Sequence, residues 1–424
     1  MFDEQRYLSP RFIINLGLLA NPRPADGGMP SDPIEILRNV WIELEEGQIM
    51  RIGSEREPVP PTAESFDIFD AAGRLATPGL IDSHTHPVFR DFRQSEFVRR
   101  CQGQGYLEIA AAGGGIQSSM RGVRSASLDE LTQLVRNRFK RFLELGVTTL
   151  EAKSGYGLSV ADELKSLEAI RIAAGEFFEV SPTLLGAHTV PPEFKENPDG
   201  YVDLVCHEMI PVAAEQSLAE AVDVFVEETA FTLEQARRVF TSARQAGLEL
   251  RIHADQFTSS GGARLAAEFK AISADHMDRT PDDELKMLAD AGVTIVLLPG
   301  AVFFLGLDRF ANARRMVEAG CKIAVSTDFN PGTSPTPSLP LMMTLACNKL
   351  KLTPSEALWA ATVGGANAIK RTDRIGRLAK GFQADICLWN ASDVDYIPYT
   401  YGDQIPVAVF KRGQLVAENG QIVG

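Results

Sequence analysis

The sequence predicts an α/β protein, a (β/α)8 TIM-like barrel that carries a small β-sandwich domain. Three observations support this fold class. Short apolar runs alternate with helical patterns through the middle of the chain, histidines follow several of these runs, and both chain ends are rich in β-favouring segments. We expect the barrel to span residues 78–371, and the β-sandwich to be a composite domain built from residues 1–77 and 372–424.

Both chain ends contain short β-favouring runs bounded by glycine, proline and aspartate. Near the N-terminus these runs are FIINLGLLA (12–20), VWIELEEGQIMRIG (40–53) and SFDIFDAAGRLATPG (65–79). The tail contains RIGRLAKGFQADICLWN (374–390) and VAVFKRGQLVAENGQIVG (407–424). The N-terminal segment has too little apolar sequence for a large core of its own, so we expect the two ends to pair into one small β domain.

From residue 78 the pattern changes to one of strand–helix units. The candidate strands are the apolar runs 80–81, 147–150, 180–185, 222–226, 248–252, 271–273, 293–298 and 322–325. Parallel strands covered by helices read as continuous apolar runs. Eight such units close most economically into a (β/α)8 barrel, in which catalytic groups lie at the C-terminal ends of the strands.

Helix start signals fall between the predicted strands. Ser127 and Thr232 each precede a Glu or Gln three residues later, which is the pattern of a capping box. Pro281 is predicted at the first position of another helix. A further helix is predicted over residues 353–370.

The length, charge and hydropathy of the chain limit its partners. With 424 residues it is long enough for a large barrel or for two to three domains. The formal net charge is −14 and no Lys/Arg cluster is present, so we expect neither nucleic acid nor an anionic membrane as a partner. The longest apolar region, residues 293–307, is interrupted by Pro299-Gly300 and falls short of the roughly 18 apolar residues of a membrane span.

The cysteines and the N-terminus predict a cytoplasmic protein. The five cysteines are odd in number and never stand in Cys-x-x-Cys spacing, which favours free thiols in a reducing compartment. The N-terminal MFDEQRYLSP is acidic early and lacks the apolar core of a secretory signal. Homodimers are common among barrels of this kind, so a homodimer is a candidate assembly.

Most of the histidines stand at or just beyond predicted strand ends. These five, out of six in the chain, are His84, His86, His188, His253 and His276. His84 and His86 follow the first strand, and residues i and i+2 at a strand end point to the same side. This alignment is improbable for ordinary core or surface histidines. The sixth, His207, is expected on the surface.

The strand-end residues predict a metal site at the barrel mouth. Three nitrogen ligands can converge there, from His84, His86 and His253. Asp328, which ends the eighth strand, can add one oxygen. Imidazole is a preferred ligand for zinc and iron. A catalytic site leaves one position open for water, and the metal lowers the pKa of that water towards about 7. We expect His276 beside the water as an electrophile or proton relay rather than as a ligand.

The sequence resembles the amidohydrolase superfamily in these ligands and in the run Pro78-Gly79-Leu80-Ile81-Asp82, which precedes His84 and His86. Longer motifs follow the family order: HTHPVF (84–89), AAGGGI (111–116), EAKSGYGL (151–158), GAHTVPPEF (186–194), HADQ (253–256), SADH (273–276), LLPGAVFFL (297–305) and STDFNPGTSP (326–335). KSGYGL and TDFNPGTSP narrow the resemblance to members that open an imidazolone ring bearing a propanoate tail. Residues 376–386 resemble the superfamily's returning β segment.

The resemblance implies a role for each matching residue. The metal ligands of the family match His84, His86, His253 and Asp328, and its substrate contacts match Arg93, Tyr156, His188, Gln256, Asn330, Gly332 and Thr333. The implied reaction is hydrolysis of the ring amide by a metal-activated water. In it Asp328 carries protons, His276 stabilises the oxyanion and Arg93 binds the carboxylate tail. The small-molecule substrate is therefore expected to be an anion.

The resemblance also bears on the metal. Binuclear members typically bridge two ions with a carboxylated lysine from the fourth strand, and AVDVFVEET (221–229) has no lysine. One ion per chain is therefore implied, with zinc expected first and iron as the alternative. Glu227 or Glu228 stays open as a bridging ligand for a second ion.

The sequence departs from the family pattern at two places. Arg90-Asp91-Phe92 replaces the two glycines that usually follow HPVF, and Phe329 replaces the usual cysteine after the metal aspartate. We expect these changes to tune the choice of substrate.

Two rival readings stay open. A deaminase of a nucleobase-like ring shares the ligand set, but it generally needs a glutamate where this chain has Gln256, which cannot titrate. A catalytically inactive scaffold would have lost metal ligands, and this chain keeps all of them.

Overall fold

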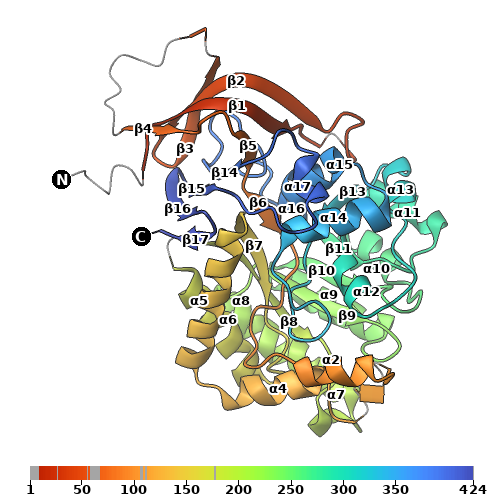
Figure 1. Ribbon diagram of the computed structural model, residues 1–424. Helices are drawn as coiled ribbons and strands as arrows, with labels where there is room; N and C mark the ends of the chain where they lie inside the picture. The colour runs from red at the N-terminus through yellow and green to blue at the C-terminus, as the bar shows by residue number, and fades with distance from the viewer. Residues whose placement is uncertain are drawn as a thin grey trace.

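The computed structural model describes residues 9–25, 27–54, 56–57, 67–105, 108–109, 112–175 and 178–423. These residues form two sheets, one parallel and one mixed. In Figure 1 the mixed sheet lies above the parallel one, whose outer face is covered by helices.

The parallel sheet has eight strands, and every ladder in it is parallel. Its strands are β6 (Leu80–Asp82), β7 (Val147–Lys153), β8 (Glu179–Ala187), β9 (Ala221–Val226), β10 (Glu249–Ala254), β11 (Ser273–His276), β12 (Thr294–Leu297) and β13 (Lys322–Val325). Neighbours in sequence are neighbours in the sheet. The predicted (β/α)8 architecture is confirmed.

The first and last strands meet at their C-terminal ends. Thr85 and Phe329 form an isolated parallel bridge, and the amide of Asp328 donates to the carbonyl of His84 at 3.1 Å. The amide of His86 donates to the carbonyl of Phe329 at 2.8 Å. The barrel is therefore closed at the edge where the candidate ligands lie.

Several predicted element boundaries were shifted by a few residues, and two of these shifts concern residues near the site. The sixth strand was predicted over 271–273, but β11 begins at Ser273, because the amide of Ala271 still donates to Ala266 at the end of helix α10. His276 is accordingly the last residue of the strand. Pro281 precedes α11 rather than opening it, and the hydroxyl of Thr280 donates to Asp255 instead of capping the helix.

Helices connect the strands and supply the outer layer. They are α2 (Gln94–Cys101), α4 (Ile116–Ser125), α5 (Leu128–Glu144), α6 (Val160–Ala174), α7 (Pro198–Leu204), α8 (Ile210–Glu215), α9 (Leu233–Gln245), α10 (Gly262–Glu268), α11 (Asp282–Ala291), α12 (Pro299–Phe304), α13 (Ala313–Glu318), α14 (Leu339–Leu350), α15 (Pro354–Trp359), α16 (Gly365–Ala368) and α17 (Tyr396–Tyr399), with the 3-10 turn η2 (Pro192–Phe194) and the π-turns η3 (Val205–Met209) and η4 (Ala360–Gly364). Thr232 and Thr353 form full capping boxes, and Ser127 accepts from the amide of Glu130.

The mixed sheet joins the two ends of the chain. It contains β1 (Phe12–Pro22), β2 (Ile34–Glu45), β3 (Gln48–Ser54), β4 (Ile68–Asp70), β5 (Leu75–Pro78), β14 (Ile386–Trp389), β15 (Ala408–Lys411), β16 (Gln414–Glu418) and β17 (Gln421–Ile422). The central ladder is antiparallel and pairs β5 with β14, so that Leu75 faces Trp389. The prediction that the two ends pair with one another is confirmed.

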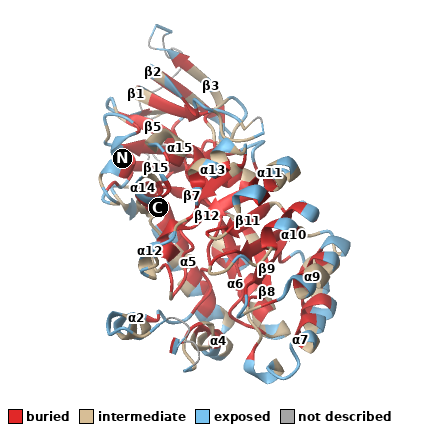
Figure 2. Cartoon of the chain, turned by 90° about the vertical axis from the view of Figure 1, so that its right-hand side faces the viewer, coloured by how far each residue is buried: buried red, intermediate tan, exposed pale blue. Residues whose placement is uncertain are grey.

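The buried apolar side chains form one large and one smaller cluster. The large cluster fills the barrel and its helices and continues into the mixed sheet through Leu75, Trp389 and Val409. The smaller one, which includes Leu16, Ile42 and Phe410, lies within the mixed sheet. Figure 2 shows the buried residues concentrated along the strands of both sheets. The mixed sheet therefore packs directly on the barrel, and the division between residues 78–371 and the two terminal segments stays a prediction. No helix in the described ranges is long and apolar enough to cross a membrane.

Residues 354–368 pack across the seam between β13 and β6. A Cβ on Gly364 would lie 2.1 Å from the carbonyl oxygen of Ile323, and one on Gly365 would lie 2.7 Å from that of Ile81. Only glycine permits so close an approach of backbone to backbone. The helix is thereby fixed against the two strands that hold His84 and Asp328.

Candidate active site

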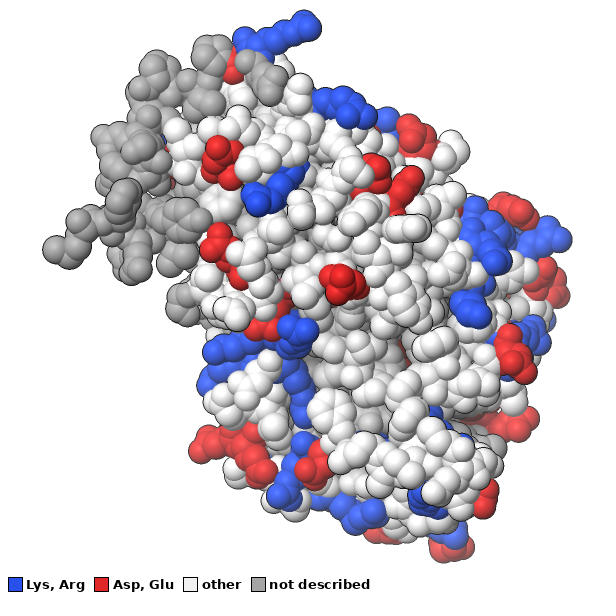
Figure 3. Space-filling view, in the orientation of Figure 1, with Lys and Arg blue, Asp and Glu red and all other residues white. Residues whose placement is uncertain are grey.

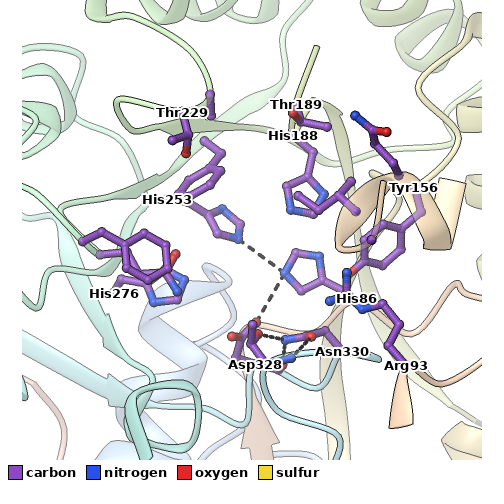
Figure 4. Close-up of a pocket in the computed structure, with 18 residues that line it drawn as sticks. His86, Arg93, Tyr156, His188, Thr189, Thr229, His253, His276, Asp328 and Asn330 are labelled. Atoms are coloured by element: carbon purple, nitrogen blue, oxygen red, sulfur yellow. Dashed lines mark hydrogen bonds and ion pairs between the residues drawn. The ribbon is translucent and has the colours of Figure 1, made fainter. Parts of the chain in front are cut away.

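The candidate residues meet at the C-terminal ends of the barrel strands. His84 and His86 follow β6, His253 lies in β10, His276 ends β11, and Asp328 follows β13. Each is at most 3% exposed. All except His84 line a cavity of about 390 Å³, and His84 lies buried behind it. Figure 4 shows His86, His253, His276 and Asp328 directed towards a common centre.

Three imidazole nitrogens and one carboxylate oxygen are spaced as the ligands of a metal ion are. The Nε2 of His86 lies 3.3 Å from that of His84 and 3.4 Å from that of His253. The Oδ1 of Asp328 lies 3.6 Å from His84 and 3.5 Å from His86. Ligands about 2.1 Å from a tetrahedral ion are about 3.4 Å apart. The donor set therefore fits an ion at its centre.

The other ring nitrogens explain why these imidazoles face one another. The Nδ1 of His84 donates to Asp275 at 2.6 Å, and the Nδ1 of His253 lies 2.9 Å from Asp223. Burial lowers the pKa of His84 and of His86 well below the ordinary value. Because the proton of His84 is on Nδ1, the lone pair of its Nε2 points into the centre of the ligand set. A cation there would offset the repulsion between the ligand lone pairs.

A buried lysine lies beneath the ligands. The ammonium of Lys153 is 2.8 Å from Glu151, 2.9 Å from Asp223 and 3.8 Å from Asp275, and all four side chains are fully buried. Asp223, Asp275 and His253 could by spacing hold a second ion, but Lys153 already supplies the positive charge there. Sequence reasoning looked for lysine only on the fourth strand. Glu151 and Lys153, two residues apart on β7, share one side of that strand, and this was the available signal.

Three residues around the cavity have left-handed backbone. The φ angles are 74° at His276, 56° at Met277 and 52° at Asp328. Such angles are unfavourable for residues with a Cβ and persist where surrounding contacts enforce them. The amide of Met277 donates to Ala254, and that of Asp328 donates to His84. The unfavourable backbone angles therefore include those of His276 and Asp328, the two residues expected to take part in proton transfer and hydrogen bonding during the reaction.

The residues predicted to contact the substrate lie around the same cavity. Those that line it are Arg93, Tyr156, His188, Gln256, Asn330 and Thr333. Gly332 lies behind Arg93 instead: a Cβ there would be 1.6 Å from the Arg93 Nη2. The amide side chain of Asn330 bonds within its own loop, to Asp328, Gly332 and Thr333. Sequence reasoning missed the lining residues Gln117, Thr189, Phe225 and Thr229.

Arg93 is a buried cation in the wall of the cavity. Its side chain is 4% exposed, and its nearest carboxylate is Glu96, 3.8 Å from Nε. Nε and Nη1 have no hydrogen-bond partner among the described residues. A buried guanidinium is costly without such partners. The cavity is therefore suited to an anionic ligand.

The carboxylates considered for a second ion do not reach the centre. Glu227 accepts from the amides of Phe257 and Thr258 and from the Thr258 hydroxyl. Glu228 is exposed. These contacts give the bridging alternative no support, because Glu227 is engaged in holding the loop after Gln256. His207 is on the surface, as predicted.

The departures from the family pattern lie outside the cavity. The ring of Phe329 packs among Phe89, Phe92 and Phe142, at centroid distances of 5.7, 6.4 and 5.5 Å. Arg90 is partly exposed and pairs with Glu130 at 3.2 Å. Neither Phe329 nor residues 90–92 line the cavity. The expectation that they tune the substrate pocket directly has no support in these contacts.

The fold and the site define a class of protein. The model of the amidohydrolase family matches residues 75–416, and the chain belongs to that family. Solved structures share the fold: an E. coli guanine deaminase has a TM-score of 0.74 at 16% identity, covering 96% of this chain and 99% of that one. A Klebsiella pneumoniae 5-methylcytosine deaminase has a TM-score of 0.73 at 15% identity, with coverages of 96% and 97%.

The sequence relatives are more specific. The imidazolonepropionase of Alkaliphilus metalliredigens is 42% identical over 392 residues, which cover 92% of this chain and 93% of the relative. That of Geobacillus kaustophilus is 45% identical over 391 residues, covering 91% and 92%. Within the amidohydrolases, the chain belongs with the imidazolonepropionases.

Proposed function

We propose that the protein hydrolyses the ring C–N amide bond of 4-imidazolone-5-propanoate to N-formimino-L-glutamate, a step of histidine degradation. One observation supports this particular substrate. A site for a water-activating metal and a buried arginine with unpartnered donors share one cavity. The substrate has a ring amide, whose hydrolysis needs the water-activating metal, and a carboxylate tail, which needs the buried arginine.

The proposed metal ligands are His84, His86, His253 and Asp328, whose spacing fits one ion. A zinc or iron ion held by these residues would supply a water of lowered pKa and would polarise the ring carbonyl. Zinc is proposed first and iron as the alternative, since both accept three imidazoles and a carboxylate. One ion per chain is proposed because Lys153 fills the second acidic cluster.

Asp328 is the proposed proton carrier, and His276 is the proposed oxyanion donor. Asp328 accepts a proton from the water as the water oxygen bonds to the ring carbonyl carbon. It returns that proton to the ring nitrogen as the C–N bond breaks. Burial lowers the pKa of His276 to about 3, so its imidazole is neutral and can donate a hydrogen bond to the developing oxyanion.

The remaining contacts orient the ring. The His188 Nδ1 donates to the carbonyl of Gly155 at 2.8 Å, which leaves Nε2 as an acceptor for a ring N–H. Arg93 binds the carboxylate tail through two parallel bonds. Gln256 faces the cavity as a neutral amide. Hydrolytic deamination of a nucleobase-like ring is disfavoured, because Gln256 cannot shuttle a proton.

The test is turnover of freshly prepared substrate by metal-loaded protein, followed as loss of imidazolone absorbance and appearance of formiminoglutamate. Arg93→Ala is expected to raise KM roughly 100-fold, because a charged hydrogen-bonding partner is lost. Arg90→Ala, which removes an arginine from the same loop at a side chain that is 43% exposed, is the matched control and should leave KM unchanged. Absence of turnover with one ion bound per chain would exclude this substrate.

Gly332→Ala provides a second test that leaves Arg93 in the sequence. The added Cβ would lie 1.6 Å from Nη2 and 2.2 Å from Cζ of Arg93, so the guanidinium must swing away. KM is expected to rise roughly 10-fold or more, with a smaller change in kcat. Gly105→Ala is the control, since a Cβ there meets nothing within 4 Å. A wild-type KM for Gly332→Ala would show that Arg93 does not hold the carboxylate.

The proposed partners are limited to the anionic small molecule and a second copy of the chain. Acidic and basic side chains are interspersed on the face shown in Figure 3, without a basic tract for nucleic acid. A cytoplasmic location is proposed because all five cysteines are free thiols. A homodimer is proposed as the assembly, and sedimentation velocity tests it.

A further inference from the structure

A buried carboxylate accepts hydrogen bonds from three backbone amides of the loop that carries Tyr156. Glu163, in the first turn of α6, is 0% exposed and lies outside the cavity lining. Its Oε2 accepts from the amide of Gly155 at 2.8 Å, and its Oε1 accepts from those of Gly157 and Leu158, both at 2.7 Å. These three donors are neutral backbone groups on either side of Tyr156.

The loop needs stabilising contacts because its backbone has positive φ angles. Gly155 has φ of +106° and Leu158 has φ of +54°. At Gly157 a Cβ would lie 2.5 Å from the carbonyl carbon of Asp162 and 2.6 Å from the amide nitrogen of Glu163, so the loop lies directly on the start of α6. Positive φ at a residue with a Cβ is retained only where other contacts enforce it. At Leu158 the amide bond to Glu163 is one such contact, and Arg124 adds bonds to the carbonyls of Gly157 at 2.8 Å and Leu158 at 2.9 Å.

The same loop fixes a second cavity residue. The carbonyl of Gly155, whose amide is held by Glu163, accepts from the Nδ1 of His188 at 2.8 Å. The His188 ring lies 5.3 Å from that of Tyr156 and 5.3 Å from that of His86. The chain of contacts thus runs from Glu163 through the loop backbone to Tyr156 and His188. Figure 4 shows these two side chains at the cavity.

We propose that Glu163 is a positioning residue. It orients Tyr156 and His188 towards the substrate ring and does not itself contact the substrate. This inference rests on the proposed function. Each carboxylate oxygen has a separate task, since Oε2 holds the Gly155 end and Oε1 holds the other end of the loop.

The first test is Glu163→Gln, in which the amide NH2 must face at least one backbone N–H where a carboxylate oxygen now accepts. We expect faster hydrogen exchange at Gly155, Gly157 and Leu158, and a KM raised roughly tenfold with unchanged metal content. The control is Glu168→Gln on the same helix, whose carboxylate pairs with Arg171 and not with the loop. Wild-type exchange and wild-type KM in Glu163→Gln would overturn the proposal.

A double-mutant cycle separates positioning from general stability. If Glu163 acts through the two side chains, Glu163→Gln should change KM by less than about threefold in a Tyr156→Phe, His188→Gln background. A full tenfold effect in that background would contradict the proposal.

Gly157→Ala keeps the Glu163 carboxylate but pushes the loop off α6, and it should reproduce the KM change if Glu163→Gln fails to fold. A wild-type KM for Gly157→Ala would also count against the proposal. The exchange readout does not depend on turnover, so it tests the bonds between Glu163 and the loop even if the proposed substrate is wrong.

Discussion

Asp328→Asn is expected to lower kcat by about 1,000-fold or more. The substitution keeps the shape of the side chain, but it removes the negative charge and the ability to take a proton from water. Asp328 lies 3.6 Å from the Nε2 of His84 and 3.5 Å from that of His86, so no other described carboxylate is placed to replace it as the oxygen of the ligand set. Loss of a general acid–base alone costs roughly 100- to 10,000-fold.

The measurement is single-substrate kinetics together with metal content and thermal unfolding. Asp91→Asn is the matched control, because it removes a carboxylate at a side chain that is 78% exposed, in the loop after His86. If Asp328→Asn binds metal and retains more than a tenth of wild-type kcat, Asp328 is not the proton carrier. If it loses the metal, the side chain acts first as a ligand.

Lys153→Met is expected to weaken both the fold and the metal site. Lys153 lies within 4 Å of Glu151, Asp223 and Asp275, all fully buried. Removing one partner of a buried ion pair leaves uncompensated charge and costs about 3–5 kcal/mol. Asp223 and Asp275 also orient His253 and His84, and disturbing such groups weakens metal binding roughly 10- to 100-fold.

Denaturant unfolding of the metal-free protein and competition with a chelator measure the two effects separately. Lys370→Met is the control: its ammonium pairs with Glu249 at 2.7 Å, at side chains that are 58% and 44% exposed. Such a surface pair contributes at most about 1 kcal/mol. An unfolding free energy and a metal affinity in Lys153→Met equal to those of the control would show that the buried charges are compensated in another way.

The barrel and the ligand set could be predicted because their signals are local. A buried parallel strand reads as a short apolar run, and the residue after it lies at the mouth whatever the rest of the chain does. His84, His253 and Asp328 therefore mark three strand ends that are far apart in sequence. The errors were at boundaries such as 271–273, where a hydrogen bond from Ala271 to the preceding helix extends the turn.

The sequence by itself determined the α/β class, the pairing of the two chain ends and the residues that face the barrel mouth, since each follows from periodicity and strand-end position. Only the tertiary structure decided what supports those residues. Glu163 holds three amides of the Tyr156 loop, Lys153 compensates two carboxylates from other strands, and Phe329 turns away from the cavity. These roles depend on distances between elements that no local pattern encodes, because a buried charge or glycine is explained only by what folds against it.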